Sequence, residues 1–157
     1  MSTSATISTD AARRAAILDN LRLHDPDQAH AMYAEDAVLE FPQSGERFVG
    51  LENIKTWRAQ YPADVRYRVR RMTGSGDLWV TELLVSYDER PWTMGVSVVT
   101  FRGDEIVREV IYVTEPWDAA AWREPWVTRF DREASVAVED YDEGVPYGLD
   151  AEFDTAR

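Results

Sequence analysis

The stretch "DLWVTELLVSYDERPWTMGVSVVTFRGDEIVREVIYVTE" (residues 77–115) decides the fold of this chain. Its apolar residues recur at every second position, and in places at neighbouring positions too, whereas the polar separators "DERP" and "RGDE" interrupt it. A period of two is typical of β-strands, and connections this short join antiparallel neighbours. With a preceding strand and its "TGSG" turn, the pattern predicts an antiparallel meander of four strands, formed by residues 65–72, 77–87, 92–101 and 106–115.

Helical spacing dominates the sequence before this meander. Thr9-Asp10 opens a first helix, and Asp25-Pro26 places proline at the first turn of a second, shorter helix that ends near Tyr33. A short hairpin of "AVLEF" and "RFVG" follows, and "LENIKTWRAQY" predicts a third helix, which Pro62 ends. Because the last two meander strands are apolar on both sides, we expect helices to cover one face of the sheet and a partner to cover the other.

Length and composition restrict the class of protein. A chain of 157 residues suits one domain, and 45% hydrophobic residues with six Trp and seven Tyr can build a core and an aromatic-lined cavity. The absence of cysteine excludes disulfides, thiolate nucleophiles and cysteine-ligated zinc. No apolar run approaches the roughly 20 residues of a membrane span, and the first residues lack a signal-peptide pattern, so we expect a cytoplasmic protein with no membrane partner.

The net charge of −12 is unevenly distributed along the chain. Residues 131–157 hold nine acidic residues and two arginines, which leaves only −5 for residues 1–130. We therefore divide the chain into an N-terminal extension (1–9), one domain (10–130) and an acidic C-terminal tail (131–157). An acidic chain repels phosphate backbones, and the arginines of "RYRVRR" alternate as on the solvated face of a strand, so we expect no nucleic-acid partner.

Taken in order, four segments carry a resemblance to a known family: "HDPDQAHAMYAEDAVLEFP", "RFVGLENIKTW", "DLWVTELLVSYDERPW" and "FRGDEIVREVIYVTEPWDAAAWREPW". Their order and spacing over residues 10–127 resemble the SnoaL-like branch of the nuclear-transport-factor-2-like, or ketosteroid isomerase-like, superfamily. This resemblance implies an α+β fold, a cone-shaped barrel in which three N-terminal helices pack in a curved, mostly antiparallel sheet. It also implies an apolar cavity at the open end and a homodimer formed through the outer face of the sheet.

The same resemblance argues against steroid-type isomerisation. In the isomerase branch the general base is an Asp that precedes a Pro at the end of the first strand, and in "YAEDAVLEFP" that position is Phe41. The positions of the two oxyanion groups fall near Ile17 and Ser97. Since Phe41 can neither take a proton nor hold a charge, we expect it to form part of an apolar pocket wall.

Two acids in the middle of strands are better candidates for chemistry. Glu82 in "LWVTELLV" and Glu109 in "IVREVIYV" interrupt apolar runs, and a buried carboxylate requires a partner, an elevated pKa or a wet cavity. Each is either a catalytic acid–base group or one half of a structural ion pair. A two-residue turn in "DERP" and a three-residue turn in "RGD" would place Glu82, Ser97 and Glu109 on one face.

The remaining candidates complete the predicted site. Tyr112 and His30 are expected, with Glu82 and Glu109, to be catalytic, and the ligand-binding set comprises Tyr33, Phe41, Trp57, Ser97 and Trp117. The segment around Trp117 is expected to pack back on the body, where it could cap the cavity or brace a dimer. The sequence has no metal-ligand spacing, no P-loop and no G-x-G-x-x-G motif, so we expect neither a metal nor a cofactor.

Two functions remain open at this point. One is a cofactor-independent enzyme that cyclises, isomerises or dehydrates an apolar or polyketide-like molecule. The other is a ligand-binding or dimerisation module that has the same cavity and no turnover. A small apolar or aromatic molecule is the expected partner in both cases.

Overall fold

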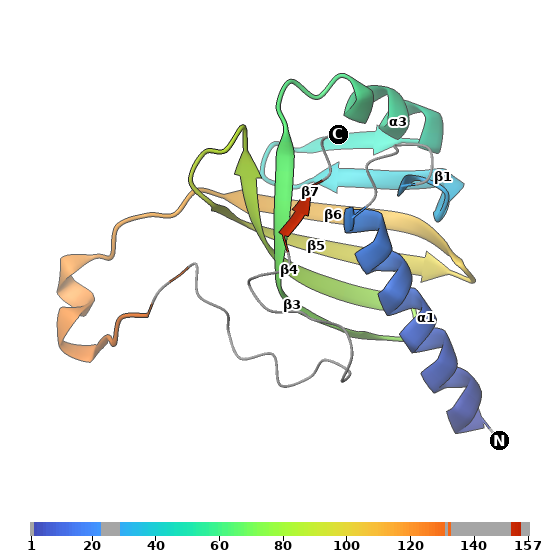
Figure 1. The fold of residues 1–157 in the computed structure, drawn as a ribbon, viewed down its shortest axis with the longest axis horizontal. Coiled ribbons are helices and arrows are strands. Elements are labelled where there is room, and N and C mark those ends of the chain that lie inside the picture. The colour runs from blue at the N-terminus through green and yellow to red at the C-terminus, as the bar shows by residue number, and fades with distance from the viewer. Residues whose placement is uncertain (1, 23–28, 131, 133–151, 155–157) are drawn as a thin grey trace.

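The computed structural model describes residues 2–22, 29–130, 132 and 152–154 (Figure 1). Helices and strands follow in the order α1 (Ser2–Arg22), β1 (Tyr33–Phe41), β2 (Glu46–Val49), α3 (Leu51–Ala59), β3 (Val65–Ser75), β4 (Leu78–Tyr87), β5 (Thr93–Arg102), β6 (Glu105–Thr114), η1 (Ala121–Trp126) and β7 (Glu152–Asp154). Within this described part of the chain, none of the helices combines the length and the apolar character of a membrane span.

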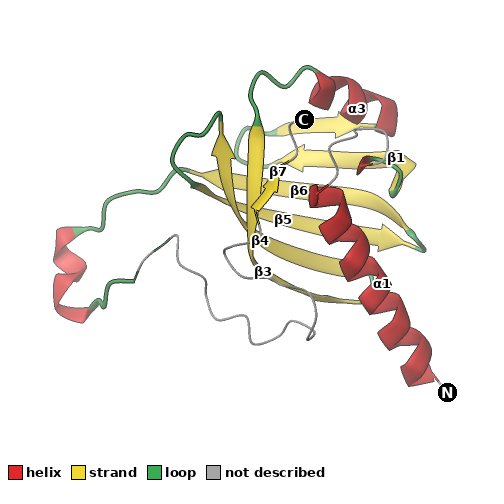
Figure 2. Cartoon of the chain, in the orientation of Figure 1, coloured by secondary structure: helices red, strands yellow, loops and turns green. Residues whose placement is uncertain are grey.

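One curved sheet organises the domain (Figures 1 and 2). Its strand order is β2-β1-β6-β5-β4-β3-β7, so the four strands of the predicted meander are consecutive neighbours, and that prediction is confirmed. All pairs are antiparallel except β1 with β6, which run parallel. Helix α1 lies across one face of the sheet, which we call the inner face, and α3 packs at the β1–β2 edge (Figure 2).

The ends of the domain differ from the sequence prediction. Helix α1 begins at Ser2, so residues 2–9 form its first turns rather than a separate extension. Most of the predicted second helix lies outside the described residues; His30–Met32 form a turn, and Tyr33 already begins β1. Most of the acidic tail also lies outside the described residues, but Glu152–Asp154 form β7 and extend the sheet beyond β3.

The register of the meander decides which side chains face α1. In the β4–β5 pair, Ser97 lies opposite Thr81, and Glu82 lies opposite Val96. The expectation that Glu82 shares a face with Ser97 is therefore wrong by one residue. The cause is the connection after β4, where Asp88 and Glu89 adopt positive φ and make a longer loop than the two-residue turn predicted for "DERP".

The β5–β6 register places Ser97 and Glu109 on one face, as predicted, but by a different route. The loop is a two-residue turn, Gly103-Asp104, because Arg102 pairs with Glu105. An irregularity follows at once: Phe101 pairs with Ile106, and Thr100 pairs with Arg108. This bulge inserts one residue into β6 and returns Glu109 to the inner face.

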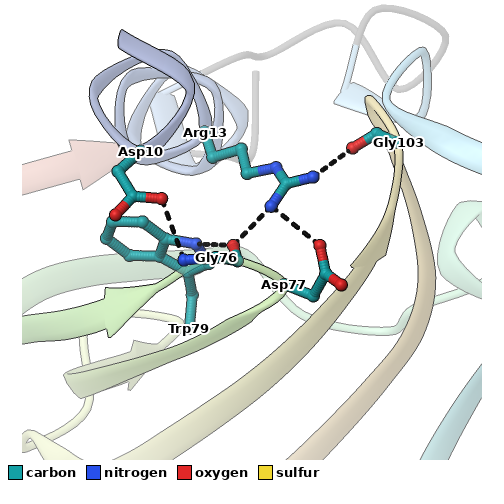
Figure 3. A network of polar contacts seen from close by, with 6 residues as sticks. All are labelled: Asp10, Arg13, Gly76, Asp77, Trp79 and Gly103. Atoms are coloured by element: carbon teal, nitrogen blue, oxygen red, sulfur yellow. Dashed lines mark hydrogen bonds and ion pairs between the residues drawn. The ribbon is translucent and has the colours of Figure 1, made fainter. Parts of the chain in front are cut away.

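Helix α1 is held on the sheet by an apolar side and by one arginine. Ile17 and Leu18 are buried in the core. One turn earlier, Arg13 donates to the Gly76 carbonyl at 2.5 Å, to the Asp77 carboxylate at 2.9 Å and to the Gly103 carbonyl at 2.6 Å (Figure 3). Arg13 thus ties α1 to both hairpin turns at this end of the sheet.

Both turns present their carbonyls to Arg13 because a glycine occupies the bend. Gly76 and Gly103 have φ of +60° and +63°, a region that residues with a Cβ rarely adopt. The Gly76 amide also donates to Asp10 of α1 at 2.9 Å, and the Trp79 indole donates to the Gly76 carbonyl at 3.0 Å (Figure 3). The β3–β4 turn therefore accepts hydrogen bonds from α1 and also donates one to it.

We expect Arg13→Met to lower the free energy of unfolding by about 2 kcal/mol, since it removes charged hydrogen bonds from a largely buried group. For a chain of this size that corresponds to a decrease in Tm of roughly 4–8 °C, measured by thermal unfolding. The control is Arg102→Met, which breaks the exposed ion pair with Asp36 and should lower Tm far less than Arg13→Met does. Equal effects of the two variants would contradict the role assigned to Arg13.

The segment from 115 to 130, which we call the aromatic arm, does not pack on the body. Its 3₁₀ helix η1 stands away from the sheet (Figure 1). Four large side chains in it are 69–76% exposed: Trp117, Trp122, Trp126 and Phe130. The prediction that this segment folds back onto its own domain is therefore wrong, and the arm leaves these four apolar side chains exposed.

Candidate functional site

A cavity of about 410 Å³ lies between α1, α3 and the inner face of the sheet. This volume lies in the range of small-molecule sites. Its lining is mostly apolar and aromatic, with residues from α1 (Ile17, Leu21), α3 (Trp57) and the strands (Phe41, Leu83, Val85, Val99, Ile111). Polar side chains also line it from several elements, and three of them, Tyr33, Arg58 and Ser97, contact Glu109.

Glu109 is 8% exposed and accepts three hydrogen bonds. Its Oε2 atom accepts from the Tyr33 hydroxyl at 2.5 Å and from Arg58 Nη2 at 2.9 Å. The other oxygen, Oε1, accepts from the Ser97 hydroxyl at 3.0 Å. The residues come from β1, α3, β5 and β6, so the register described above is what assembles the cluster. Of the two oxygens, Oε1 is the one with a lone pair left for a ligand.

His30 extends this cluster through Arg58. His30 is buried, and its Nε2 atom lies 3.0 Å from Arg58 Nη1. Because a guanidinium group carries only donors, Nε2 must accept, and His30 is then the neutral tautomer with its proton on Nδ1. The same Nη1 donates to the Tyr33 oxygen at 3.4 Å. Arg58 therefore holds an imidazole, a phenol and a carboxylate together.

The electrostatics of the cluster favour one charge state. Burial raises the pKa of the Tyr33 phenol well above its usual value; Arg58 partly opposes this and Glu109 adds to it. Desolvation disfavours the Arg58 cation, but the attraction of Tyr33 and Glu109 outweighs it, and the pKa of Arg58 is raised. Tyr33 thus stays protonated as a donor, and Arg58 stays charged.

A second phenol faces the same charges. Tyr67 on β3 lines the cavity, and burial raises its pKa to about 12, with Arg58 lowering it and Glu109 raising it. Among the described residues, none accepts a hydrogen bond from the Tyr67 hydroxyl. This hydroxyl is therefore a neutral donor that a bound molecule could use.

Aromatic rings form the wall beside this cluster. Trp57 contacts Phe48 with ring centroids 4.5 Å apart and contacts Phe41 edge-on at 5.5 Å. Tyr61 follows Trp57 at 6.1 Å and continues to Tyr87 at 6.1 Å. Flat, apolar walls of this kind suit a ring-shaped ligand.

The structure brings six of the nine predicted site residues to the cavity: His30, Tyr33, Phe41, Trp57, Ser97 and Glu109. The other three lie elsewhere. Glu82 is on the outer face, paired with Arg71 at 3.3 Å, and Tyr112 is 44% exposed on the same face, opposite Val96. Trp117 is on the aromatic arm, outside the cavity.

Sequence reasoning missed Arg58, the residue that connects the cluster. A helical period could have indicated it, because Arg58 follows the fully buried Ile54 by four positions and so shares its face of α3. Tyr33 was assigned to the wall, whereas the structure makes it a hydrogen-bond donor at the start of β1. In the described residues, no group of three acidic or imidazole side chains converges to hold a metal ion.

The chain is similar to known proteins in both sequence and fold. A family model for the SnoaL-like domain matches residues 15–109. A solved NTF-2-like protein of unknown function from Burkholderia xenovorans LB400 is 36% identical with a TM-score of 0.63, and the match covers 76% of this chain and 98% of that one. No curated protein matches the chain.

Two other solved structures are similar. One is a candidate ketosteroid isomerase from Kribbella flavida DSM 17836, with 23% identity and a TM-score of 0.70, covering 78% of this chain and 90% of that one. The other is a candidate polyketide cyclase from Sinorhizobium meliloti, with 25% identity and a TM-score of 0.53, covering 62% of this chain and 90% of that one. The first of these supports the fold alone.

Proposed function

Because this chain belongs to the SnoaL-like domain family, we propose that it binds a small apolar or polyketide-like molecule and transforms it by acid–base chemistry that uses no cofactor. The reaction would be a cyclisation, an isomerisation or a dehydration. In this proposal the cavity is the open end of a cone-shaped barrel with three N-terminal helices. The observation that carries it is a buried carboxylate, Glu109, facing a cavity of about 410 Å³.

The arrangement assigns a role to each side chain. Glu109 Oε1 would take a proton from a substrate carbon next to a carbonyl; the electron pair of that C–H bond would form a C=C bond, and the π pair of the carbonyl would move to its oxygen. Tyr67, with its unused hydroxyl, would donate to this developing oxyanion, and the Arg58 charge would stabilise it. Tyr33 and Ser97 would orient the carboxylate.

A specific observation favours a second function, ligand binding without turnover. Glu109 already accepts from a phenol, a guanidinium and a hydroxyl, so its carboxylate is fixed in place and three of its lone pairs are occupied. In that case the same cluster would be a fixed anchor for the polar end of an apolar ligand.

One experiment separates these functions. Aromatic and polyketide-like compounds are screened by thermal shift against the wild type and Glu109→Gln, and each compound that binds is then incubated and analysed for products. If the protein is an enzyme that uses Glu109 as its base, the wild type should form product and the variant should form none, and both proteins should bind the compound. Binding of a compound by both proteins without any product would establish the second function.

We also propose that the chain forms a homodimer through the outer face of its sheet, with the aromatic arm bracing the partner. Val96, Val98 and Val110 on that face are partly exposed, and Tyr112 is 44% exposed. Four aromatic side chains of one arm could bury about 600 Å² or more. Two arms would then exceed the roughly 1,000 Å² that a specific interface needs.

We expect the wild type to have twice the mass of one chain in size-exclusion chromatography with light scattering. The double substitution Trp122→Ser/Trp126→Ser should raise the dimer Kd by at least roughly a hundredfold, because both arms lose two anchors. Glu52→Arg, at an exposed position on α3 and away from the outer face, is the control and should leave the mass unchanged. A wild type that is monomeric at micromolar concentration would refute the dimer.

A further inference from the structure

The cavity holds two buried polar atoms that the fold leaves without a partner. In the described part of the chain, five buried side-chain nitrogen or oxygen atoms have no hydrogen-bond partner. Three are Nε atoms of arginines whose guanidinium groups have other contacts, at Arg13, Arg14 and Arg70. The two neutral atoms that remain are Thr81 Oγ1 and Asn20 Oδ1, and both residues line the cavity.

The other serine and threonine hydroxyls that are buried on β4 and β5 have partners, which makes Thr81 an exception. Ser86 donates to the Arg90 carbonyl at 2.6 Å, and Thr93 donates to the Val85 carbonyl at 3.1 Å. Ser97, directly opposite Thr81 in the sheet, donates to Glu109. Thr81 itself is 1% exposed and forms no such bond. A buried hydroxyl without a partner is unfavourable, so its presence on a cavity wall points to a ligand.

Thr81 and Asn20 reach the cavity from two different elements, and neither is bonded to Glu109. Thr81 is on β4 and Glu109 is on β6, so two strand spacings, roughly 10 Å across the sheet, separate them. Asn20 enters from α1, on the opposite wall of the cavity. A hydroxyl donates one hydrogen bond and accepts others, so one ligand hydroxyl can accept from Thr81 Oγ1 and donate to Asn20 Oδ1.

We propose that the ligand of this cavity is an apolar ring compound that carries a hydroxyl group, held between Thr81 and Asn20, away from the part that meets Glu109. This inference rests on the proposed function in requiring a ligand in the cavity, but it does not require turnover. It narrows the ligand class from any apolar molecule to one with a hydroxyl at one end.

The test compares 2-naphthol with 2-fluoronaphthalene, which has the same shape and cannot donate a hydrogen bond. Binding of each probe is measured by ¹H–¹⁵N NMR titration on the wild type, Thr81→Val and Thr81→Ser. Valine keeps the shape of threonine without the hydroxyl, and serine keeps the hydroxyl. We expect the wild type to bind 2-naphthol about tenfold more tightly than 2-fluoronaphthalene, with the preference retained in the serine variant and reduced in the valine variant, where only the hydrogen bond to Asn20 remains.

Stability of the free protein gives a second readout that needs no ligand. If the Thr81 hydroxyl has no partner, Thr81→Val should leave Tm unchanged or raise it. A lower Tm for the valine variant than for the serine variant would show that the fold itself satisfies this hydroxyl, and would overturn the proposal. Equal affinities of the two probes for the wild type, or no binding of either, would also overturn it.

Failure of the subsite and failure of the proposed chemistry are distinguishable. Glu109→Gln tests turnover and should leave the preference for 2-naphthol intact, because Glu109 is two strands away. Thr81→Val should reduce the preference in both the wild-type and the Glu109→Gln background. A hydroxyl preference without turnover would support the subsite and favour the binding function.

Discussion

Replacing Arg58 with Met should lower the free energy of unfolding by about 3 kcal/mol, at the lower end of the range for breaking a buried ion pair. Arg58 is the only cation that contacts Glu109 among the described residues, at 2.9 Å. Its removal leaves a carboxylate that is 8% exposed with only two neutral donors, Tyr33 and Ser97. The Arg58 side chain is 26% exposed, which is why we expect the lower end of the range.

Chemical denaturation of single and double variants tests this expectation. Glu109→Gln should destabilise less than Arg58→Met, because the arginine left behind still reaches water and the Tyr33 oxygen. The double variant Arg58→Met/Glu109→Gln should recover most of the loss, since neither charge remains. Glu82→Gln, which breaks a half-exposed pair with Arg71, is the surface control and should change stability by less than about 1 kcal/mol. If the losses of stability in the two single variants add up in the double variant, the two residues are not coupled.

The strands of the meander were predictable because their signal is local. A period of two and short turns give each strand and its neighbour, and the observed strands lie within a few residues of the predicted ones. The register was not predictable from the same pattern. It depends on the backbone of a loop, where Asp88 and Glu89 take positive φ, and on a bulge after Phe101. One residue in either place moves a side chain to the other face.

Because the register depends on this loop and this bulge, only one of the two strand acids, Glu109, reaches the cavity. Glu109 and Ser97 reach the cavity because a two-residue turn and a bulge compensate for each other. Glu82 has no such compensation and meets Arg71 on the outer face. Arg58 was missed for another reason: a charged residue near the end of a helix looks solvated, and only its tertiary partners distinguish it.

Glu109→Gln should lower kcat by about 10²–10⁴-fold on any substrate that the screen identifies, the usual contribution of a positioned acid–base group. Glutamine has the shape of glutamate, its amide oxygen can accept from Arg58 and Tyr33, and its amide nitrogen can donate to the Ser97 hydroxyl, so the cavity should keep its form and ligand affinity should change little. An amide cannot take a proton from carbon, and only the chemical step is then lost.

The matched control is Glu82→Gln, the same substitution two strands away on the outer face, which should leave kcat unchanged. Single-turnover measurements on the wild type and both variants separate binding from chemistry. A Glu109→Gln variant that retains wild-type kcat would exclude Glu109 as the proton acceptor. His30 would not replace it as the base, because the one lone pair of its Nε2 atom already accepts from Arg58 and its Nδ1 atom carries the proton.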